Sequence, residues 1–217
     1  MTPFGHTPTM IVIRPSTRDD IATIRDVEVD AGQMFRSVGL DTIADDDPPG
    51  SATIAEHLRR ATAWTAELDA SVVGYALSSV VDGQGHLDQI SVRRAAAGQG
   101  IGRLLIDHVC RWASECGHDE LTLTTFVDVP WNGPYYTRLG FRHLDDADCG
   151  PDLGAIREKE RRAGIDVAPR TAMRLLLEHW VSPDLPPTAD EGHLPLFRRQ
   201  PQQPPSGPVR NRDRPGA

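Results

Sequence analysis

The stretch LDQISVRRAAAGQGIGRLL, residues 87–105, joins a strand-like run to a helix through a glycine-rich loop. Ile90 and Val92 are β-branched residues typical of a strand. Three glycines follow where a helix begins. Backbone N–H groups at a helix start have no intrahelical partner and lie at the positive end of the helix dipole, and glycine lets an anion approach them closely. The stretch therefore indicates an anion site. A strand-to-helix turn that only needs positive φ would use the same residues.

The spacing of the glycines excludes two familiar nucleotide-binding loops. A P-loop ends in Gly-Lys-Ser/Thr, whereas Gly102 is followed by Arg103. The dinucleotide fingerprint is G-x-G-x-x-G and opens the first strand-helix unit. Here the pattern is G-x-G-x-G, and it comes after several strands that look antiparallel.

Composition limits the class of protein. The chain has a net charge of −8 and 39% hydrophobic residues, and its 217 residues suggest one domain with appendages, or at most two small domains. The negative charge argues against a nucleic-acid partner. We find neither a long apolar run for a membrane nor a basic-then-apolar leader. Cys110, Cys116 and Cys149 are too few, and odd in number, for a disulfide framework, so we expect a cytoplasmic protein.

Hydrophobic periodicity and turn residues predict the element order β-α-α-β-β-β-α-β-α-β-(helix)-β, without an internal repeat. The three central strand-like runs are 62–68, 71–81 and 85–92, separated by short turns. The helix after the glycine loop has an apolar stripe. Its expected members are Ile101, Leu104, Leu105, His108, Val109 and Trp112.

The chain divides into three regions. Residues 10–181 form the expected domain, after a flexible N-terminus over residues 1–9. Residues 182–217 hold nine of the 18 prolines, together with Gln and Arg. Such a segment buries too little apolar surface to offset the entropy of ordering, so we expect it to be largely disordered.

A second motif, NGPYYTRLGF at residues 132–141, follows the glycine loop further along the chain. Together the two motifs resemble the acyl-CoA-binding and second signatures of the GNAT N-acetyltransferase family. The resemblance covers about residues 10–177. It implies an α/β protein of the α+β type, with a GNAT-like mixed, mostly antiparallel central sheet flanked by helices.

The resemblance also implies where coenzyme A would bind. Its pyrophosphate would contact the backbone amides of the loop, namely Gly98, Gln99, Gly100, Ile101 and Gly102, with added charge from Arg103. Its pantetheine arm would bond to the backbone of Ile90, Ser91 and Val92, where the strand separates from its neighbour. Ala97 departs from the family pattern, which has Arg or Gln there. Arg93, Arg94 or Arg103 would supply the missing charge, unless Arg93 and Arg94 only form a solvated turn.

By the same resemblance, Tyr136 is the candidate general acid for the leaving thiolate. Tyr135 is its competitor, and Tyr136 could instead pack only with Leu139 and Phe141. Asn132 could bond to the pantetheine arm or organise the turn before Pro134.

An amine must lose a proton before it attacks a thioester. His86 and Asp88 lie two residues apart on one strand and so share a face, which makes either a candidate base. The alternative is that both face solvent at a strand edge. A backbone N–H near Ile90 or Ser91 would bind the oxyanion.

Three other features are set aside. His108, Cys110, Cys116 and His118 do not converge on a helix, so no metal is expected. The acidic loop at 45–47 is interpreted as solvated, although loops there border the acceptor pocket in the family. The segment 153–164 is interpreted as a charged surface helix within an insertion.

The resemblance implies an N-acetyltransferase that moves an acetyl group from acetyl-CoA to a primary amine directly, in a ternary complex. Neither motif contains a cysteine, which argues against an acyl-enzyme. The acceptor would be a small-molecule amine or a peptide or protein amine, with no nucleic-acid or membrane partner, and the family allows a homodimer. One alternative is a non-catalytic acyl-CoA-binding module acting through its proline-rich tail. Another is a nucleotide-binding protein.

Overall fold

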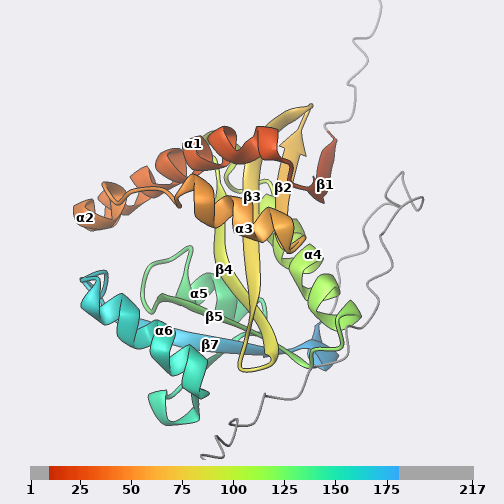
Figure 1. Ribbon diagram of the computed structural model, residues 1–217. Helices are drawn as coiled ribbons and strands as arrows, with labels where there is room; N and C mark the ends of the chain where they lie inside the picture. The colour runs from red at the N-terminus through yellow and green to blue at the C-terminus, as the bar shows by residue number, and fades with distance from the viewer. Residues whose placement is uncertain (1–9, 181–217) are drawn as a thin grey trace, which may run out of the picture.

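Seven strands form one sheet in the computed structural model, which describes residues 10–180 (Figure 1). The strands lie in the order β1-β2-β3-β4-β5-β7-β6. All neighbours are antiparallel except β4 and β5, which are parallel. The predicted fold class is therefore confirmed. The expectations for residues 1–9 and for the proline-rich tail lie outside the described residues.

The strands follow the predicted runs closely. Their bounds are β1 Ile11–Pro15, β2 Ala63–Leu68, β3 Ser71–Val81, β4 Gln84–Val92, β5 Glu120–Phe126, β6 Arg142–Leu144 and β7 Arg170–Leu176. The hairpin between β3 and β4 turns at Asp82 and Gly83, both with positive φ, in the manner of a two-residue hairpin loop.

Helices cover both faces of the sheet. The α-helices are α1 Ile21–Gly32, α2 Asp41–Ala44, α3 Ser51–Arg59, α4 Ile101–Glu115, α5 Gly133–Arg138 and α6 Pro151–Arg162. Short 3-10 helices are Arg18–Asp20, Gln33–Val38, Arg94–Ala96, Asp146–Asp148 and Leu177–His179. Buried side chains place α1, α3 and α6 on one face and α4 with α5 on the other. No helix among residues 10–180 has the length and apolar character needed to cross a bilayer.

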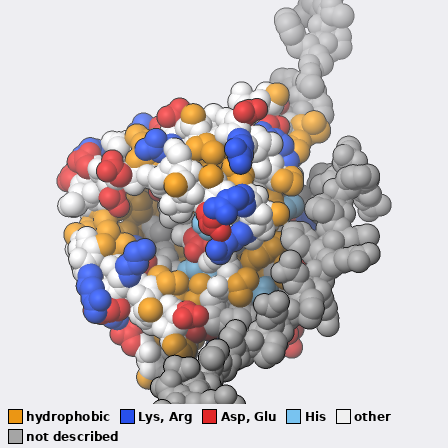
Figure 2. All heavy atoms as spheres, viewed as in Figure 1, with side chains coloured by type: hydrophobic (Ala, Val, Ile, Leu, Met, Phe, Trp, Pro, Cys, Tyr) orange, Lys and Arg blue, Asp and Glu red, His pale blue; other side chains and the backbone are white. Residues whose placement is uncertain are grey.

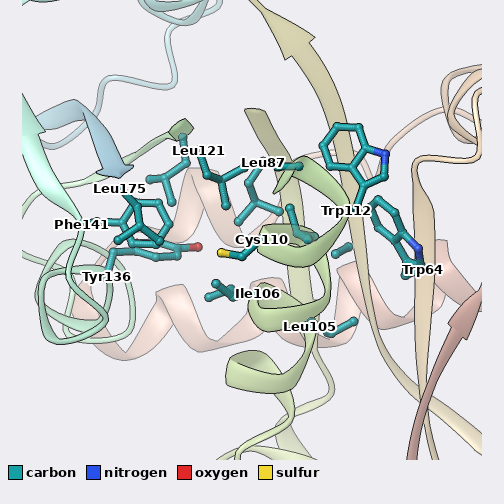
Figure 3. Packing of buried hydrophobic residues seen from close by; sticks show 14 of the residues in the cluster. Trp64, Leu87, Leu105, Ile106, Cys110, Trp112, Leu121, Tyr136, Phe141 and Leu175 are labelled. Carbon is teal, nitrogen blue, oxygen red and sulfur yellow. The ribbon is translucent and has the colours of Figure 1, made fainter. Parts of the chain in front are cut away.

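The largest core cluster forms between α4 and the sheet (Figure 3). The predicted stripe on α4 is narrower than the buried face. Ile106 and Cys110 are buried and point toward Tyr136 of α5, while Trp112 lies on the side of Trp64. Leu104 and His108, expected in the stripe, are only half-buried. The face is broader because α4 packs against α5 and β7 as well as against the central strands.

The insertion between β6 and β7 carries α6 and is fixed to the β3–β4 hairpin. The carboxylate of Asp82 accepts hydrogen bonds from the amides of Asp152 and Leu153, both at 2.9 Å. These are the otherwise unsatisfied donors of the first turn of α6. Leu153 packs with Val81 and Ala172 beneath the helix. The insertion thus forms part of the same body as the sheet.

Candidate active site

The glycine loop presents unpaired backbone donors at the start of α4. The amides of residues 98–102 donate to no backbone or side-chain acceptor within the described residues. Gly98 and Gly100 have φ of 77° and 82°, the left-handed region that favours glycine. A Cβ at either position would meet nothing within 4 Å, so the space above the loop is open. This geometry fits a phosphate group.

The arginines around the loop have other contacts. The side chain of Arg94 pairs with Asp30 of α1, whose carboxylate also accepts from the Arg94 amide at 2.8 Å. These interactions lower the pKa of Asp30, although its partial burial opposes the shift. Arg93 donates to the carbonyl of Val72 at 3.4 Å. The Arg103 guanidinium lies over the ring of Trp180, 4.3 Å from its centroid. These contacts hold the three guanidinium groups on Asp30, Val72 and Trp180.

Strands β4 and β5 separate directly before this loop. They pair only at Gly85, His86 and Leu87 of β4, opposite residues 121–123 of β5. Residues 90–92, predicted to hold a pantetheine arm, lie beyond the last pair. Asp88 is a β-bulge, because Leu77 and Ser78 of β3 oppose Gln89 and Leu87 and skip it. The bulge lies where the two strands diverge.

Helix α5 closes the base of this gap. Gly133 approaches the end of β5 so closely that a Cβ would lie 2.3 Å from the Val127 carbonyl oxygen, so only glycine fits. Asn132 donates through Nδ2 to Thr125 Oγ1 at 3.0 Å, while its Oδ1 is buried and has no partner in the part of the chain that the structure describes. Tyr136 is 7% exposed and packs with Phe141, and its hydroxyl has no hydrogen-bond partner among the described residues (Figure 3). Burial raises the pKa of Tyr136, so the hydroxyl stays protonated.

A cleft of about 330 Å³ opens at the divergence of β4 and β5. Figure 2 shows the surface hollowed between the region of α2, where acidic side chains gather, and α6, where basic ones gather. The polar residues along it are Glu28, Asp46, Asp47, Asp88, Gln89, Thr124, Thr125, Asn132, Tyr136, Glu160 and Arg170. Apolar residues of α1, of residues 35–49, of β4 and β5, and of the loop after α6 line the rest.

The two candidate bases differ in their access to this cleft. Asp88 lines it and accepts a hydrogen bond from Ser79 at 2.9 Å. The surrounding walls desolvate the carboxylate and raise its pKa, although it remains open to solvent; attraction to His86 opposes the shift. His86 is 2% exposed, with Nδ1 2.8 Å from Thr122 Oγ1, and burial lowers its pKa. The structure therefore brings Asp88, but not His86, to the cleft surface.

Glu28 of α1 is a cleft residue that the sequence did not single out. Its carboxylate accepts hydrogen bonds from Tyr75 at 2.7 Å, Gln89 at 2.7 Å and Ser91 at 2.5 Å. These donors lie on β3 and β4, 47 to 63 residues away along the chain. No local pattern marks such a contact. A glutamate on the sheet-facing side of a helix beside two buried residues, Ile24 and Val27, was the only available signal.

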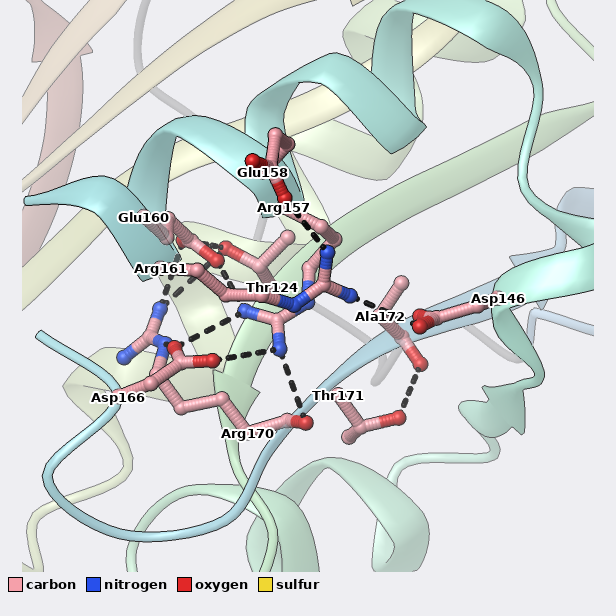
Figure 4. Close-up of polar contacts among 10 residues, drawn as sticks. All are labelled: Thr124, Asp146, Arg157, Glu158, Glu160, Arg161, Asp166, Arg170, Thr171 and Ala172. Carbon is pink, nitrogen blue, oxygen red and sulfur yellow. Dashed lines mark hydrogen bonds and ion pairs between the residues drawn. The ribbon is translucent and has the colours of Figure 1, made fainter.

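The wall opposite α1 is an ion-pair network between α6 and β7 (Figure 4). Glu160 accepts from Arg170 at 2.8 Å and from Thr124 at 2.5 Å, and it also pairs with Arg157. Arg157, only 3% exposed, is also paired with Asp166. Helix α6 is the expected charged helix at the surface, but the expectation missed that Arg157 is buried and that Glu160 borders the cleft.

A second depression, of about 530 Å³, lies on the outer side of this network. Its arginines, Arg157, Arg161 and Arg170, are already paired with carboxylates, and it lies away from the glycine loop and β4. We therefore place the candidate site in the cleft. Within residues 10–180, no three His, Cys, Asp or Glu side chains converge as a metal-binding group.

Comparison with known proteins agrees with this geometry. Residues 32–141 match the sequence profile of the Acetyltransferase (GNAT) family. That range contains both strands of the gap, the glycine loop, α4 and α5.

Solved structures with the same fold include three bacterial proteins. An acetyltransferase of the GNAT family from Staphylococcus aureus Mu50 superposes with a TM-score of 0.61 at 16% identity, covering 77% of this chain and 99% of that one. A Mycobacterium tuberculosis protein solved in complex with CoA gives 0.57 at 20% identity, covering 76% and 98%. The ribosomal-protein-S18-alanine N-acetyltransferase of Escherichia coli gives 0.56 at 17% identity, covering 77% and 94%. These likenesses extend over most of the chain and show its fold.

Proposed function

Because the chain belongs to the Acetyltransferase (GNAT) family, we propose that it transfers an acetyl group from acetyl-CoA to a primary amine, directly and within a ternary complex. One observation carries the proposal. The pairing of β4 with β5 ends at Leu87 and Leu123, immediately before a loop whose amides have no acceptor among the described residues. An acyl-CoA has an extended, amide-containing arm, which the unpaired end of β4 could bind, and a pyrophosphate, which the loop amides could bind.

The donor would be held mainly by backbone groups. The amides of Gly98, Gln99, Gly100, Ile101 and Gly102 would bind the pyrophosphate, with Arg103 nearby. The backbone of Ile90, Ser91 and Val92 would pair with the pantetheine arm as an added strand. The unpaired Oδ1 of Asn132 would accept from an amide of that arm, since a buried acceptor without a partner costs free energy.

The chemical step needs a neutral amine, a site for the oxyanion and help for the departing thiolate. Asp88 would take the proton from the amine, directly or through water, because it is the candidate base that lines the cleft. The amine nitrogen then attacks the thioester carbon, the C–S bond breaks, and the sulfur receives a proton. A backbone N–H near Ile90 or Ser91 would stabilise the oxyanion.

Tyr136 would assist the leaving sulfur. A free thiol has a pKa of about 8.5, whereas burial raises the pKa of Tyr136 above its ordinary value. Full proton transfer from the phenol to a thiolate of that pKa is therefore uphill, and it becomes possible only because the same buried surroundings also raise the pKa of the thiol. We propose that the hydroxyl first donates a hydrogen bond to the developing thiolate and transfers its proton as the bond breaks.

The acceptor can be a small-molecule amine or a peptide or protein amine. The name of the Escherichia coli fold relative identifies an alanine of ribosomal protein S18 as its acceptor, and another GNAT-fold structure, from Neisseria gonorrhoeae, is N-acetylglutamate synthase. The fold therefore accommodates both classes. Homodimer formation and a cytoplasmic location stay predictions from the sequence.

A panel of primary amines, followed by free-thiol release from acetyl-CoA, tests the proposal. We expect at least one amine to give catalytic turnover that Gly100→Val abolishes. If coenzyme A binds but no amine is acetylated, the chain is a binding module instead. If ADP binds as tightly as coenzyme A, the pantetheine arm contributes nothing and the nucleotide-binding alternative holds.

A further inference from the structure

The Glu28 carboxylate lines the cleft and has no positively charged partner within residues 10–180. Its three hydrogen bonds come from the neutral side chains of Tyr75, Gln89 and Ser91. No arginine, lysine or histidine of the described residues pairs with it. An ionised carboxylate offers about four lone-pair sites, so three donors leave room for one more, on the side that lines the cleft.

The remaining charges of the cleft make this negative potential stronger. Glu160 is neutralised by Arg157 and Arg170. Asp46, Asp47 and Asp88 line the cleft and, like Glu28, have no ion-pair partner within the described residues. Arg170, whose guanidinium also lies over the Phe126 ring, is the only arginine or lysine among the lining residues. Such a cleft attracts cations.

Two further observations, independent of these charges, indicate that the cleft takes a ligand. Tyr136 lines it and is only 7% exposed, yet its hydroxyl has no hydrogen-bond partner among the described residues. The Oδ1 of Asn132 is likewise buried and unpaired. Buried polar groups normally have partners, so both atoms are suited to a bound molecule.

The position of Glu28 relative to Asp88 defines the shape of that molecule. The donors Gln89 and Ser91 lie one and three residues beyond Asp88 on β4, which corresponds to roughly 3–10 Å along a strand. A molecule with one amine beside Asp88 and a second positive group beside Glu28 would span this range. A short extended diamine has that length.

We propose that Glu28 binds a second ammonium group of the acceptor, so that the cleft selects diamines and related polycationic amines over monoamines. This inference rests on the proposed acetyl transfer and names its acceptor class. Glu28 is a specificity-determining residue here, whereas Asp88 serves the amine that reacts. The ammonium would donate to the free lone pair of a carboxylate already oriented by three hydrogen bonds, which is a strong type of interaction.

The probes are 1,4-diaminobutane, 1-aminobutane and 4-aminobutanoate, which share a four-carbon chain and differ at one end. We expect kcat/KM for thiol release to favour the diamine over 1-aminobutane by at least about tenfold. We expect 4-aminobutanoate to be the poorest substrate, because its carboxylate would be repelled by Glu28. Glu28→Gln should bring the diamine to monoamine ratio close to one. Glu115→Gln, which removes an exposed carboxylate on α4, should leave the ratio unchanged.

A purely structural role for Glu28 would lower thermal stability without changing that ratio. Two variants keep the test decisive if Glu28→Gln does not fold. Tyr75→Phe removes one hydrogen-bond donor but keeps the carboxylate, so it should retain the preference for the diamine. Glu28→Asp shortens the side chain and moves the carboxylate away from the cleft, so it should reduce that preference. A diamine preference that persists in Glu28→Asp or Glu28→Gln, or a ratio near one in the unaltered chain, would overturn the inference.

Calorimetric titration of 1,4-diaminobutane into the same proteins separates this inference from the proposed function. Glu28-dependent binding without any thiol release would support a diamine site at Glu28 but reject acetyl transfer, and with it the role of the diamine as acceptor. Thiol release with all amines alike would uphold transfer and reject the role of Glu28.

Discussion

Leu87 of β4 and Leu123 of β5 form the last register pair between the two parallel strands of the sheet. Beyond this pair the strands diverge, with the Asp88 bulge on one side and Thr124 to Phe126 on the other. The divergence places unpaired strand backbone beside the glycine loop and the mouth of a cleft. An acyl donor bound along β4 and the loop, and an amine bound in the cleft, could therefore meet where the two strands diverge.

Gly100→Val should abolish tight coenzyme A binding. At φ of 82° a β-branched residue is strained, and its side chain would fill the open space above the loop. We expect at least a tenfold loss of affinity, about 1.4 kcal/mol, by calorimetry. Gly117→Val is the matched control, because Gly117 has φ of 81°, open surroundings and a place at the opposite end of α4. Equal losses in both variants would mean that strain alone is responsible.

Ala97→Arg should tighten coenzyme A binding by about 1 kcal/mol, the typical value of one charge-assisted hydrogen bond at an exposed site. Ala97 is exposed, and the neighbouring Arg94 is held by Asp30. The gain should shrink at high salt. Ala95→Arg adds the same charge two residues away and controls for general attraction. An equal gain in both variants would argue against a specific phosphate contact at position 97.

Tyr136→Phe should lower kcat about 100-fold and leave the affinity for acetyl-CoA nearly unchanged. The ring packing against Phe141 is kept, so folding should survive. Tyr135→Phe is the control, because its hydroxyl lies near Gly102 of α4 instead. The loss in Tyr136→Phe should be smaller with a thioester whose thiolate leaves easily. Parental activity in Tyr136→Phe would remove the phenol from the mechanism.

Asp88→Asn should lower activity and raise stability at neutral pH. Desolvation raises the pKa of Asp88, so its protonated form favours folding at low pH and that contribution is lost as pH rises through the raised pKa. The neutral asparagine avoids this loss. We therefore expect thermal unfolding to show a higher Tm for Asp88→Asn near pH 7 and converging Tm values toward pH 3.

The raised pKa of Asp88 should also appear in the pH dependence of kcat/KM. The acidic limb of kcat/KM in the unaltered chain should reflect loss of the Asp88 carboxylate, above the usual range for aspartate, and should disappear in Asp88→Asn. A variant with parental turnover would exclude Asp88 as the base. A lower Tm near pH 7 would show that the carboxylate supports the fold instead.

The sequence predicted the order of elements and the glycine loop because both depend on local chemistry. Strand-like runs separated by short turns mark β2, β3 and β4, and positive-φ positions before α4 favour glycine. The Tyr136 motif was also readable, although the hydroxyl's lack of a partner was not.

Contacts between residues that are far apart in the chain could not be predicted from the sequence. The charged pattern of α6 indicated a solvated helix, but Arg157 is buried by ion pairs with Glu160 and Asp166. Glu28 reaches Ser91 across 63 residues, and Arg103 stacks on Trp180. Each partner is selected by the three-dimensional packing of α1, α4 and α6 on the sheet, which no periodicity encodes.

The most direct test of the account is to incubate the chain with acetyl-CoA and 1,4-diaminobutane and to quantify free coenzyme A and acetylated amine together by mass spectrometry. The account predicts that both products form in equal amounts over many turnovers, that no acetyl group remains on the protein, and that Gly100→Val forms neither. An acetylated protein, or tight coenzyme A binding without acetylation of this or any other amine, would contradict it.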